Sequence, residues 1–132
     1  MIRLMIAFAL LPLAAGADTL PASAEDIAAG AAIFERRCSQ CHGLDRVNYR
    51  APYLNDILGR PSASVPDWDY SPALKAWGGV WTEENLRAWL TKPQDLVPGT
   101  AMTFGGFRSR NEDRDRVIDF LLSASSEPPA AP

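Results

Sequence analysis

Both cysteines and the only histidine of this chain lie within five residues, as Cys38, Cys41 and His42. In this C-x-x-C-H order, the two thiols can add to the two vinyl groups of one haem, and the adjacent imidazole can then bind the iron. Other uses of the same residues compete with haem attachment. A structural zinc site takes four protein ligands, whereas the chain offers only these three cysteine and histidine side chains.

Two further alternatives use the cysteines alone. A redox-active C-x-x-C pair belongs in a βαβ unit, and no segment of the chain shows a convincing alternating strand pattern. A plain disulfide between Cys38 and Cys41 stays open at this stage. Covalent haem is the interpretation that uses both thiols and the imidazole together, so we expect one haem c for the chain.

A haem iron bound by His42 needs a sixth ligand, and Met102 is the strongest candidate. The chain has no second histidine, and Met1 and Met5 belong to the signal peptide predicted below. A methionine that only fills a core usually lies on a helical or strand stripe, whereas Met102 follows the Pro98-Gly99 turn. A His/Met pair raises the reduction potential. It also leaves no open position on the iron, which favours electron transfer over chemistry on a bound molecule.

Residues 1–17 have the layout of a secretory signal peptide. Arg3 precedes an apolar run from Leu4 to Leu13, and an A-x-A cleavage site ends at Ala17. The run is shorter than the roughly 20 residues that span a bilayer. We therefore expect cleavage after Ala17 and export to the periplasm, with an uncleaved anchor as the alternative and no stable membrane insertion. Loss of Arg3 changes the formal net charge from −3 to −4.

The remaining residues are enough for one domain, predicted over 18–122. Residues 123–132 are rich in Ser, Pro and Ala, a composition typical of a disordered tail. Ser23, Thr82 and Asn111 each precede acidic residues and an apolar stripe with helical spacing, and Pro93 ends the second of these helices. The acidic balance of the chain gives no support to nucleic-acid binding.

The stretch from Gly43 to Trp81 is much longer than an ordinary loop and contains little periodic pattern. It nevertheless carries Trp68, Tyr70 and Trp77. A buried haem would give these aromatic side chains an apolar plate to pack against. Without haem we expect a poorly packed or unfolded chain.

Together these motifs resemble the class I monohaem cytochromes c, the mitochondrial and bacterial c2-type family, over about Glu25 to Leu122. The matching segments are Gly30 and Phe34, Leu58-Gly59-Arg60, Tyr70-Ser71, Trp81, Leu90-Thr91-Lys92-Pro93, Pro98 to Met102 and Ile118 to Leu121. The resemblance implies an all-α fold of three to five helices wrapped around one covalent haem, with the N-terminal and C-terminal helices crossed. Gly30 would allow the close approach of these two helices, and Phe34 and Phe120 would pack there.

The resemblance also implies a set of haem contacts. The carbonyl of Pro52 would accept a hydrogen bond from the Nδ1–H of His42 and so orient its ring. The family pattern places Arg60, Tyr70, Ser71 and Trp81 around the haem propionates. Thr100 would hydrogen-bond a propionate, and Phe104 would shield the haem edge near Met102.

The chain departs from the family pattern in its distal pocket and in its charge. Trp89 replaces a usual Tyr and Leu74 a usual Asn, so we expect a more apolar pocket with an altered potential. Lys75 and Lys92 are the only lysines, so the ring of lysines that docks to acidic partners is missing. The cationic run of Arg108, Arg110, Arg114 and Arg116 is interpreted mainly as a solvated helix face.

The predicted function is that of an exported single-electron carrier rather than an enzyme. We expect a monomer that meets redox partner proteins, whose identity the sequence does not give. One alternative is a haem site with a labile Met102 that binds small molecules or acts as a peroxidase. Another is a dedicated electron-transfer subunit of a redox enzyme complex.

Overall fold

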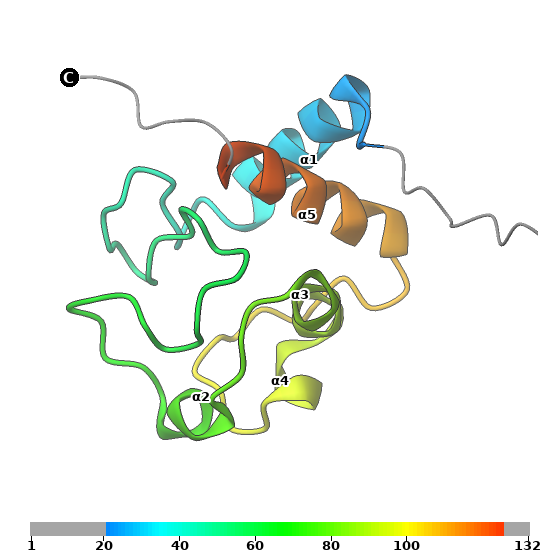
Figure 1. The fold of residues 1–132 in the computed structure, drawn as a ribbon. Helices are drawn as coiled ribbons and strands as arrows, with labels where there is room; N and C mark the ends of the chain where they lie inside the picture. Colours follow the sequence, from blue (N-terminus) through cyan, green and yellow to red (C-terminus); the bar gives the residue numbers. More distant parts are fainter. Residues whose placement is uncertain (1–20, 126–132) are drawn as a thin grey trace, which may run out of the picture.

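The computed structural model describes residues 21–125 and is built from helices and long loops (Figure 1). The helices are α1 (Ala24–Arg37), α2 (Pro72–Trp77), α3 (Glu83–Thr91), α4 (Pro93–Leu96) and α5 (Asn111–Ser125). Within residues 21–125 there is no strand, and one isolated bridge pairs Pro61 with Val80. The predicted all-α fold class is confirmed. The predicted signal peptide and residues 126–132 of the predicted tail lie outside the described residues.

Local capping explains where α1 and α3 begin. The Ser23 hydroxyl accepts a hydrogen bond from the Asp26 N–H at 3.0 Å, and the Thr82 hydroxyl accepts one from the Asn85 N–H at 3.1 Å. Each bond satisfies one of the free N–H groups at a helix start. The N-caps predicted at Ser23 and Thr82 are confirmed.

The last helix is longer than the sequence indicated. It continues to Ser125, so the predicted tail that begins at Ser123 is wrong for its first three residues. The hydroxyls of Ser123 and Ser125 donate to the carbonyls of Phe120 and Leu121 at 2.7 and 2.9 Å. Such back-bonding lets serine continue a helix, and composition alone does not show it.

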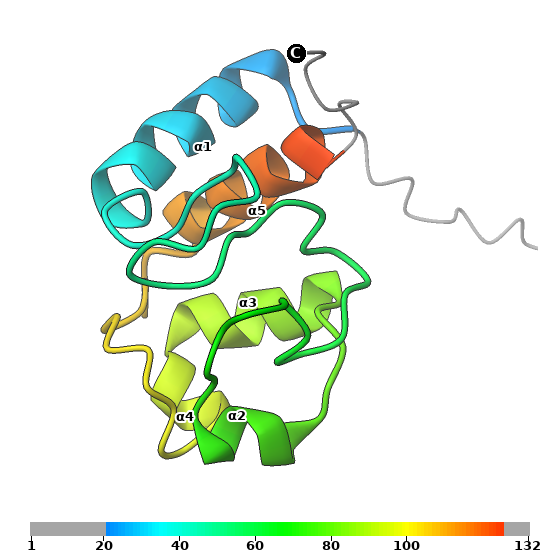
Figure 2. The same cartoon turned by 90° about the vertical axis from the view of Figure 1, so that its left-hand side faces the viewer.

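Helices α1 and α5 cross at Gly30, and we call them the crossed pair (Figures 1 and 2). A Cβ atom at Gly30 would lie 1.9 Å from the carbonyl oxygen of Arg116. The rings of Phe34 and Phe120 pack beside this point, with centroids 5.4 Å apart. The Arg116 side chain reaches Asp26 of α1 at 3.0 Å. The predicted close approach and ring packing are confirmed.

Two arginines of α5 make contacts with other helices, which a solvated helix face would not make. Arg114 is only 14% exposed and donates to the hydroxyl of Thr91 at 2.9 Å, which joins α5 to α3. Arg116 joins α5 to Asp26 of α1. The interpretation as a solvated face is wrong for these two arginines, because each has a partner on another helix.

Two short helices were not predicted. Both α2 and α4 begin with a proline, at Pro72 and Pro93, and the Ser71 hydroxyl caps α2 through the Leu74 N–H at 3.2 Å. Pro93 does end α3, as predicted, but its fixed φ also suits the first position of the next helix.

In residues 43–81, which we call the loop half, several backbone N–H groups donate to carbonyls of other loop segments. The Gly59 N–H donates to the Trp81 carbonyl and the Trp81 N–H donates to the Arg60 carbonyl, both at 2.9 Å. The Ser62 N–H donates to the Gly79 carbonyl at 2.8 Å. The loop half thus pairs with itself without forming a sheet. It meets α3 through the packed rings of Trp81 and Trp89.

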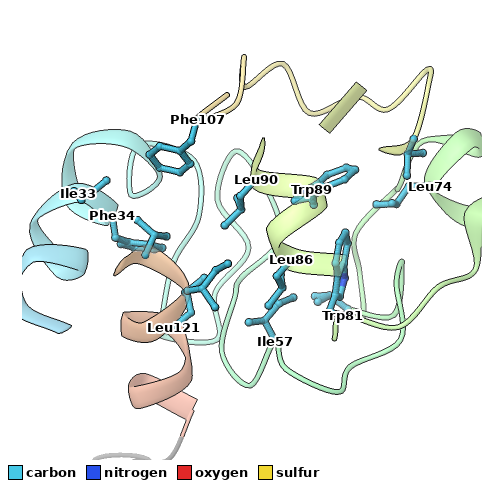
Figure 3. Packing of buried hydrophobic residues seen from close by; sticks show 14 of the residues in the cluster. Ile33, Phe34, Ile57, Leu74, Trp81, Leu86, Trp89, Leu90, Phe107 and Leu121 are labelled. Atoms are coloured by element: carbon cyan, nitrogen blue, oxygen red, sulfur yellow. The ribbon is translucent and has the colours of Figure 1, made fainter. Parts of the chain in front are cut away.

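The buried apolar side chains run from the crossed pair to the loop half (Figure 3). Phe34 and Leu121 lie at one end of this cluster and Leu74 and Trp81 at the other, with α3 between them. Among residues 21–125, no helix has the length and apolar character to cross a lipid bilayer.

Candidate functional site

A cavity of about 330 Å³ lies between the crossed pair, α3 and the loop half. This volume is at the lower end of the range for small-molecule and cofactor sites. Apolar side chains make most of the wall, including Ile57, Leu86 and Val117. The cavity therefore offers a shielded site for a largely apolar group.

The C-x-x-C-H residues reach this cavity from the end of α1. The Cys38 carbonyl accepts hydrogen bonds from the N–H groups of Cys41 and His42 at 3.0 and 2.9 Å. This single tight turn brings the side chains of all three residues to the cavity wall. The local geometry thus gathers two thiols and an imidazole at one end of the cavity.

The His42 ring is oriented by a backbone carbonyl, as predicted. Its Nδ1 lies 2.7 Å from the carbonyl oxygen of Pro52. A carbonyl only accepts, so Nδ1 carries the proton and Nε2 keeps a lone pair for a metal. Burial lowers the pKa of His42, against the opposing effect of the Pro52 hydrogen bond. The ring is therefore neutral at pH 7, the form that binds metals.

The two cysteine side chains are partly buried and line the cavity. Burial raises the pKa of the Cys38 thiol to about 11, against a smaller opposing effect of Arg37. Redox-active and catalytic cysteines instead have lowered pKa values. Among residues 21–125, no three His, Cys, Asp or Glu side chains are arranged to hold a metal ion. The surroundings of Cys38 thus favour the protonated thiol.

Met102 also lines the cavity, on a segment whose backbone is held by two hydrogen bonds. Its N–H donates to the hydroxyl of Thr100 at 3.3 Å, and its carbonyl accepts from the side-chain amide of Gln94 at 2.5 Å. The chain reaches this position through Gly99, whose φ of +87° favours glycine. The thioether is therefore placed by main-chain contacts.

Arg60 brings a cation to the cavity without a matching anion. Its guanidinium donates to the carbonyls of Asn55 and Tyr53 at 2.9 and 3.1 Å, and among the described residues it forms no ion pair. Burial lowers its pKa. A buried cation is costly unless an anion compensates it, so this corner of the cavity suits a carboxylate-bearing group.

The structure brings all the sequence-predicted site residues to this one cavity. The wall includes Cys38, Cys41, His42, Pro52, Arg60, Tyr70, Ser71, Trp81, Thr100, Met102 and Phe104. Several of their polar groups already have protein partners. The Tyr70 hydroxyl accepts from the Val65 N–H at 3.2 Å, and the Ser71 hydroxyl caps α2.

Trp89 and Leu74, the two departures from the family pattern, are 7% exposed and line the cavity. Sequence reasoning missed Gln94, which holds the Met102 carbonyl from α4. It also missed Phe107, which is 2% exposed and packs against Phe104 with ring centroids 5.3 Å apart. No periodic pattern points to Gln94, because its contact depends on how α4 folds back.

The donor set of the cavity fits a covalently attached haem. Two thiols, an imidazole and a thioether all line the cavity, and the Arg60 cation lies beside apolar side chains of its wall. This arrangement defines a c-type cytochrome site.

The comparisons identify the family. A family model for cytochrome c matches residues 27–125, and the chain belongs to the cytochrome c family. The chain is 40% identical over 110 residues to a cytochrome c2 of Agrobacterium tumefaciens, which covers 80% of this chain and 97% of that protein. These matches confirm the class I resemblance. Members of this family bind haem c covalently, which confirms the predicted cofactor.

Other similar proteins match this chain over part of their own length or in their fold. A cytochrome c homolog of Rickettsia conorii is 47% identical over 88 residues, which are 65% of this chain and 50% of that protein, so the chain spans about half of its length. The solved structure of cytochrome cH from Methylobacterium extorquens has a TM-score of 0.69 and 33% sequence identity. The match covers 74% of this chain and 98% of the cytochrome cH chain.

Proposed function

We propose that this protein is an exported single-electron carrier whose haem iron is bound by His42 and Met102. The observation that carries the proposal is that these two side chains, sixty positions apart in the sequence, line one cavity. When bound, haem c supplies one-electron oxidation and reduction at its iron. Two protein ligands leave no open position on the iron, which supports electron transfer and not catalysis on a bound substrate.

The chain's own residues would tune and protect this site. The Pro52 carbonyl fixes the His42 ring, and Thr100 and Gln94 hold the Met102 backbone. Apolar walls exclude water, and a thioether ligand favours ferrous iron. These features support a raised reduction potential and a site that changes little between the two oxidation states.

The haem propionates would lie at the Arg60 corner of the cavity. The guanidinium there lacks an anionic partner among the described residues, and Tyr70, Ser71 and Trp81 line the same wall. Thr100 would supply a further donor. Charge compensation of this kind is what two buried carboxylates need.

Export and partner choice are inferred from the sequence and the surface. The predicted signal peptide supports a periplasmic location, and we propose a monomer that exchanges electrons with redox proteins. Both lysines are engaged locally, Lys75 with Asp69 at 2.9 Å and Lys92 with Asp95 at 2.6 Å. We therefore propose docking through a weakly charged face, for which the rate of electron transfer falls little with added salt.

The proposed ligation is tested by the absorption spectrum of the ferric protein. The parent should show the weak long-wavelength sulfur-to-iron charge-transfer band, and Met102→Ala should lack it while keeping covalent haem. Gln94→Ala is the companion variant, because it loosens the Met102 segment and keeps the sulfur, so the band should weaken or become labile. A parent protein without the band would refute His42/Met102 ligation and make small-molecule binding or peroxidase chemistry the leading function.

A further inference from the structure

Three of the four tryptophans form a continuous chain of packed rings. The Trp77 and Trp81 ring centroids are 5.1 Å apart with an interplanar angle of 42°. The Trp81 and Trp89 centroids are also 5.1 Å apart, at 62°. Figure 3 shows the last two rings side by side in the core.

The chain joins the cavity to the surface. Trp89 and Trp81 are 7% and 6% exposed and both line the cavity that also holds Met102. Trp77 is outside the cavity wall, half-buried at the end of α2 and followed by the exposed Gly78. The rings therefore form a path with a buried end and a solvent-accessible end.

Packing alone does not require this choice of side chain. Tryptophan loses one electron more readily than most side chains, so three tryptophan rings in contact offer sites between which an electron can pass. The fourth tryptophan, Trp68, lines the cavity and takes part in none of these ring contacts. Trp68 is thus a second redox-active side chain at the cavity, and it must be replaced before the path through the packed rings is tested.

We propose that Trp77, Trp81 and Trp89 carry single electrons from the haem pocket to the surface at Trp77, where the reduced protein quenches strong one-electron oxidants such as peroxyl radicals. A peroxyl radical takes the hydrogen atom of the Trp77 Nε1–H group and becomes a hydroperoxide. One electron from the reduced haem then passes through Trp89 and Trp81, and Trp77 takes up a proton from water. In sum, one ferrous haem and one proton convert one peroxyl radical to a hydroperoxide, and the haem becomes ferric.

This activity goes beyond the proposed carrier function. It needs the haem c of the family but no protein partner, and it does not depend on which residue is the sixth ligand. The sulfur-to-iron band tests the ligation independently, so failure of one proposal can be told from failure of the other.

The test uses the ferrous holoprotein and azide radicals made by a short radiolysis pulse, because azide radicals oxidise tryptophan by one electron. Tryptophanyl absorbance should decay in a first-order phase that does not depend on protein concentration. Ferrous haem absorbance should disappear with the same rate constant. If all haem oxidation is second order in the parent protein, the proposal is wrong.

Two variants and a control locate the path. Trp81→Phe removes the middle ring's redox activity, so the first-order rate constant should fall about tenfold, which is a barrier about 1.4 kcal/mol higher. Trp77→Phe should remove the first-order phase, and this variant carries the test if Trp81→Phe does not fold. Both variants are made in a Trp68→Phe background, which serves as the control, because Trp68 also lines the cavity and would reach the haem without these ring contacts. An unchanged phase in Trp81→Phe or in Trp77→Phe overturns the proposal.

Discussion

The crossed pair and the loop half are held together by different means. In the crossed pair, the helices bury Ile33 and Ile118, at 6% and 0% exposure, away from the cavity, and Gly30 lets the two backbones meet. In the loop half, Ile57 and Trp81 are also buried, but both line the cavity. The crossed pair thus has buried contacts of its own beyond the cavity, whereas these two buried side chains of the loop half depend on what fills the cavity.

This difference predicts that haem loss acts on one region first, and this is the largest effect we expect. In a Cys38→Ala/Cys41→Ala variant, covalent attachment is impossible, so the apolar wall of the loop half has nothing to pack against. Amide hydrogens of residues 43–81 should lose their protection in hydrogen exchange read by mass spectrometry, while α1 and α5 keep part of theirs. Ser39→Ala, in the same turn, should keep haem and protection. An equal loss of protection in residues 43–81 and in the crossed pair would show that the two regions do not differ in their dependence on haem.

The crossed pair can be broken without touching the haem. Gly30→Ala puts a Cβ atom where the Arg116 carbonyl lies 1.9 Å away. We expect the free energy of unfolding of the holoprotein to fall by about 3 kcal/mol, the upper part of the range for overpacking. Denaturant titration measures this change.

A matched substitution separates crowding from helix propensity. Ala32→Gly, at an exposed site of α1, should cost about 1 kcal/mol because glycine is the poorer helix former. By propensity alone, Gly30→Ala would stabilise the protein by a similar amount. A measured gain for Gly30→Ala would show that the helices can move apart at little cost.

A polar substitution in the cavity wall should change function more than stability. Leu74→Asn places an amide in an apolar wall, which costs about 1–3 kcal/mol if its groups stay unpaired. The amide dipole favours the more highly charged ferric haem, so the midpoint potential should fall. Spectroelectrochemistry measures the shift, with Ala76→Asn on the exposed side of α2 as control. An unchanged potential in Leu74→Asn would refute a tuning role for this wall.

The smallest expected effect concerns charge in the crossed pair. Hydrogen bonds from the Ser23 hydroxyl and Arg116 lower the pKa of Asp26 below its ordinary value of 3.8. Because the folded state favours the carboxylate, this stability is present above pH 3.8 and is lost as pH falls through the lowered pKa. Asp26→Asn should slightly reduce stability at pH 7, and the difference should vanish in acid.

Asp119, on the other helix of the crossed pair, should show the opposite pH dependence. Burial, followed by the charge of Asp115, raises the pKa of Asp119, so its carboxylate disfavours the folded state at neutral pH. Asp119→Asn should therefore increase stability at pH 7, and the gain should shrink as pH falls through the raised pKa. Thermal melts of both variants from pH 7 to pH 2.5 would show whether the two trends diverge.

The crossed pair was largely predictable from the sequence because its signals are local. Ser23 marks a helix start, and Gly30 with Phe34 matches a family pattern. The exceptions were the contacts of Arg114 and Arg116, which involve other helices and leave no trace in a charge count.

The loop half and the Met102 segment were less predictable. Helices of six and four residues are too short to show apolar periodicity, although Ser71 followed by Pro72 is a start signal that could have been used. The residues that the sequence proposed for the site all line the cavity, because the C-x-x-C-H run and the lack of another methionine beyond the predicted signal peptide narrow the choice. The hydrogen bond from the Gln94 side chain to the Met102 carbonyl could be found only from the folded structure.

One consequence follows from the sixty positions that separate His42 from Met102. In the proposed ligation, haem is bonded near the first and its iron is bound to the sulfur of the second, which would close the chain into a loop of about sixty residues. By the loop-entropy estimate for disulfides, such a cross-link removes roughly 4 kcal/mol of conformational entropy from the unfolded chain. Because a thioether binds ferrous iron more strongly than ferric iron, the reduced protein keeps this cross-link at higher denaturant. Gaining an electron should therefore make the protein harder to unfold.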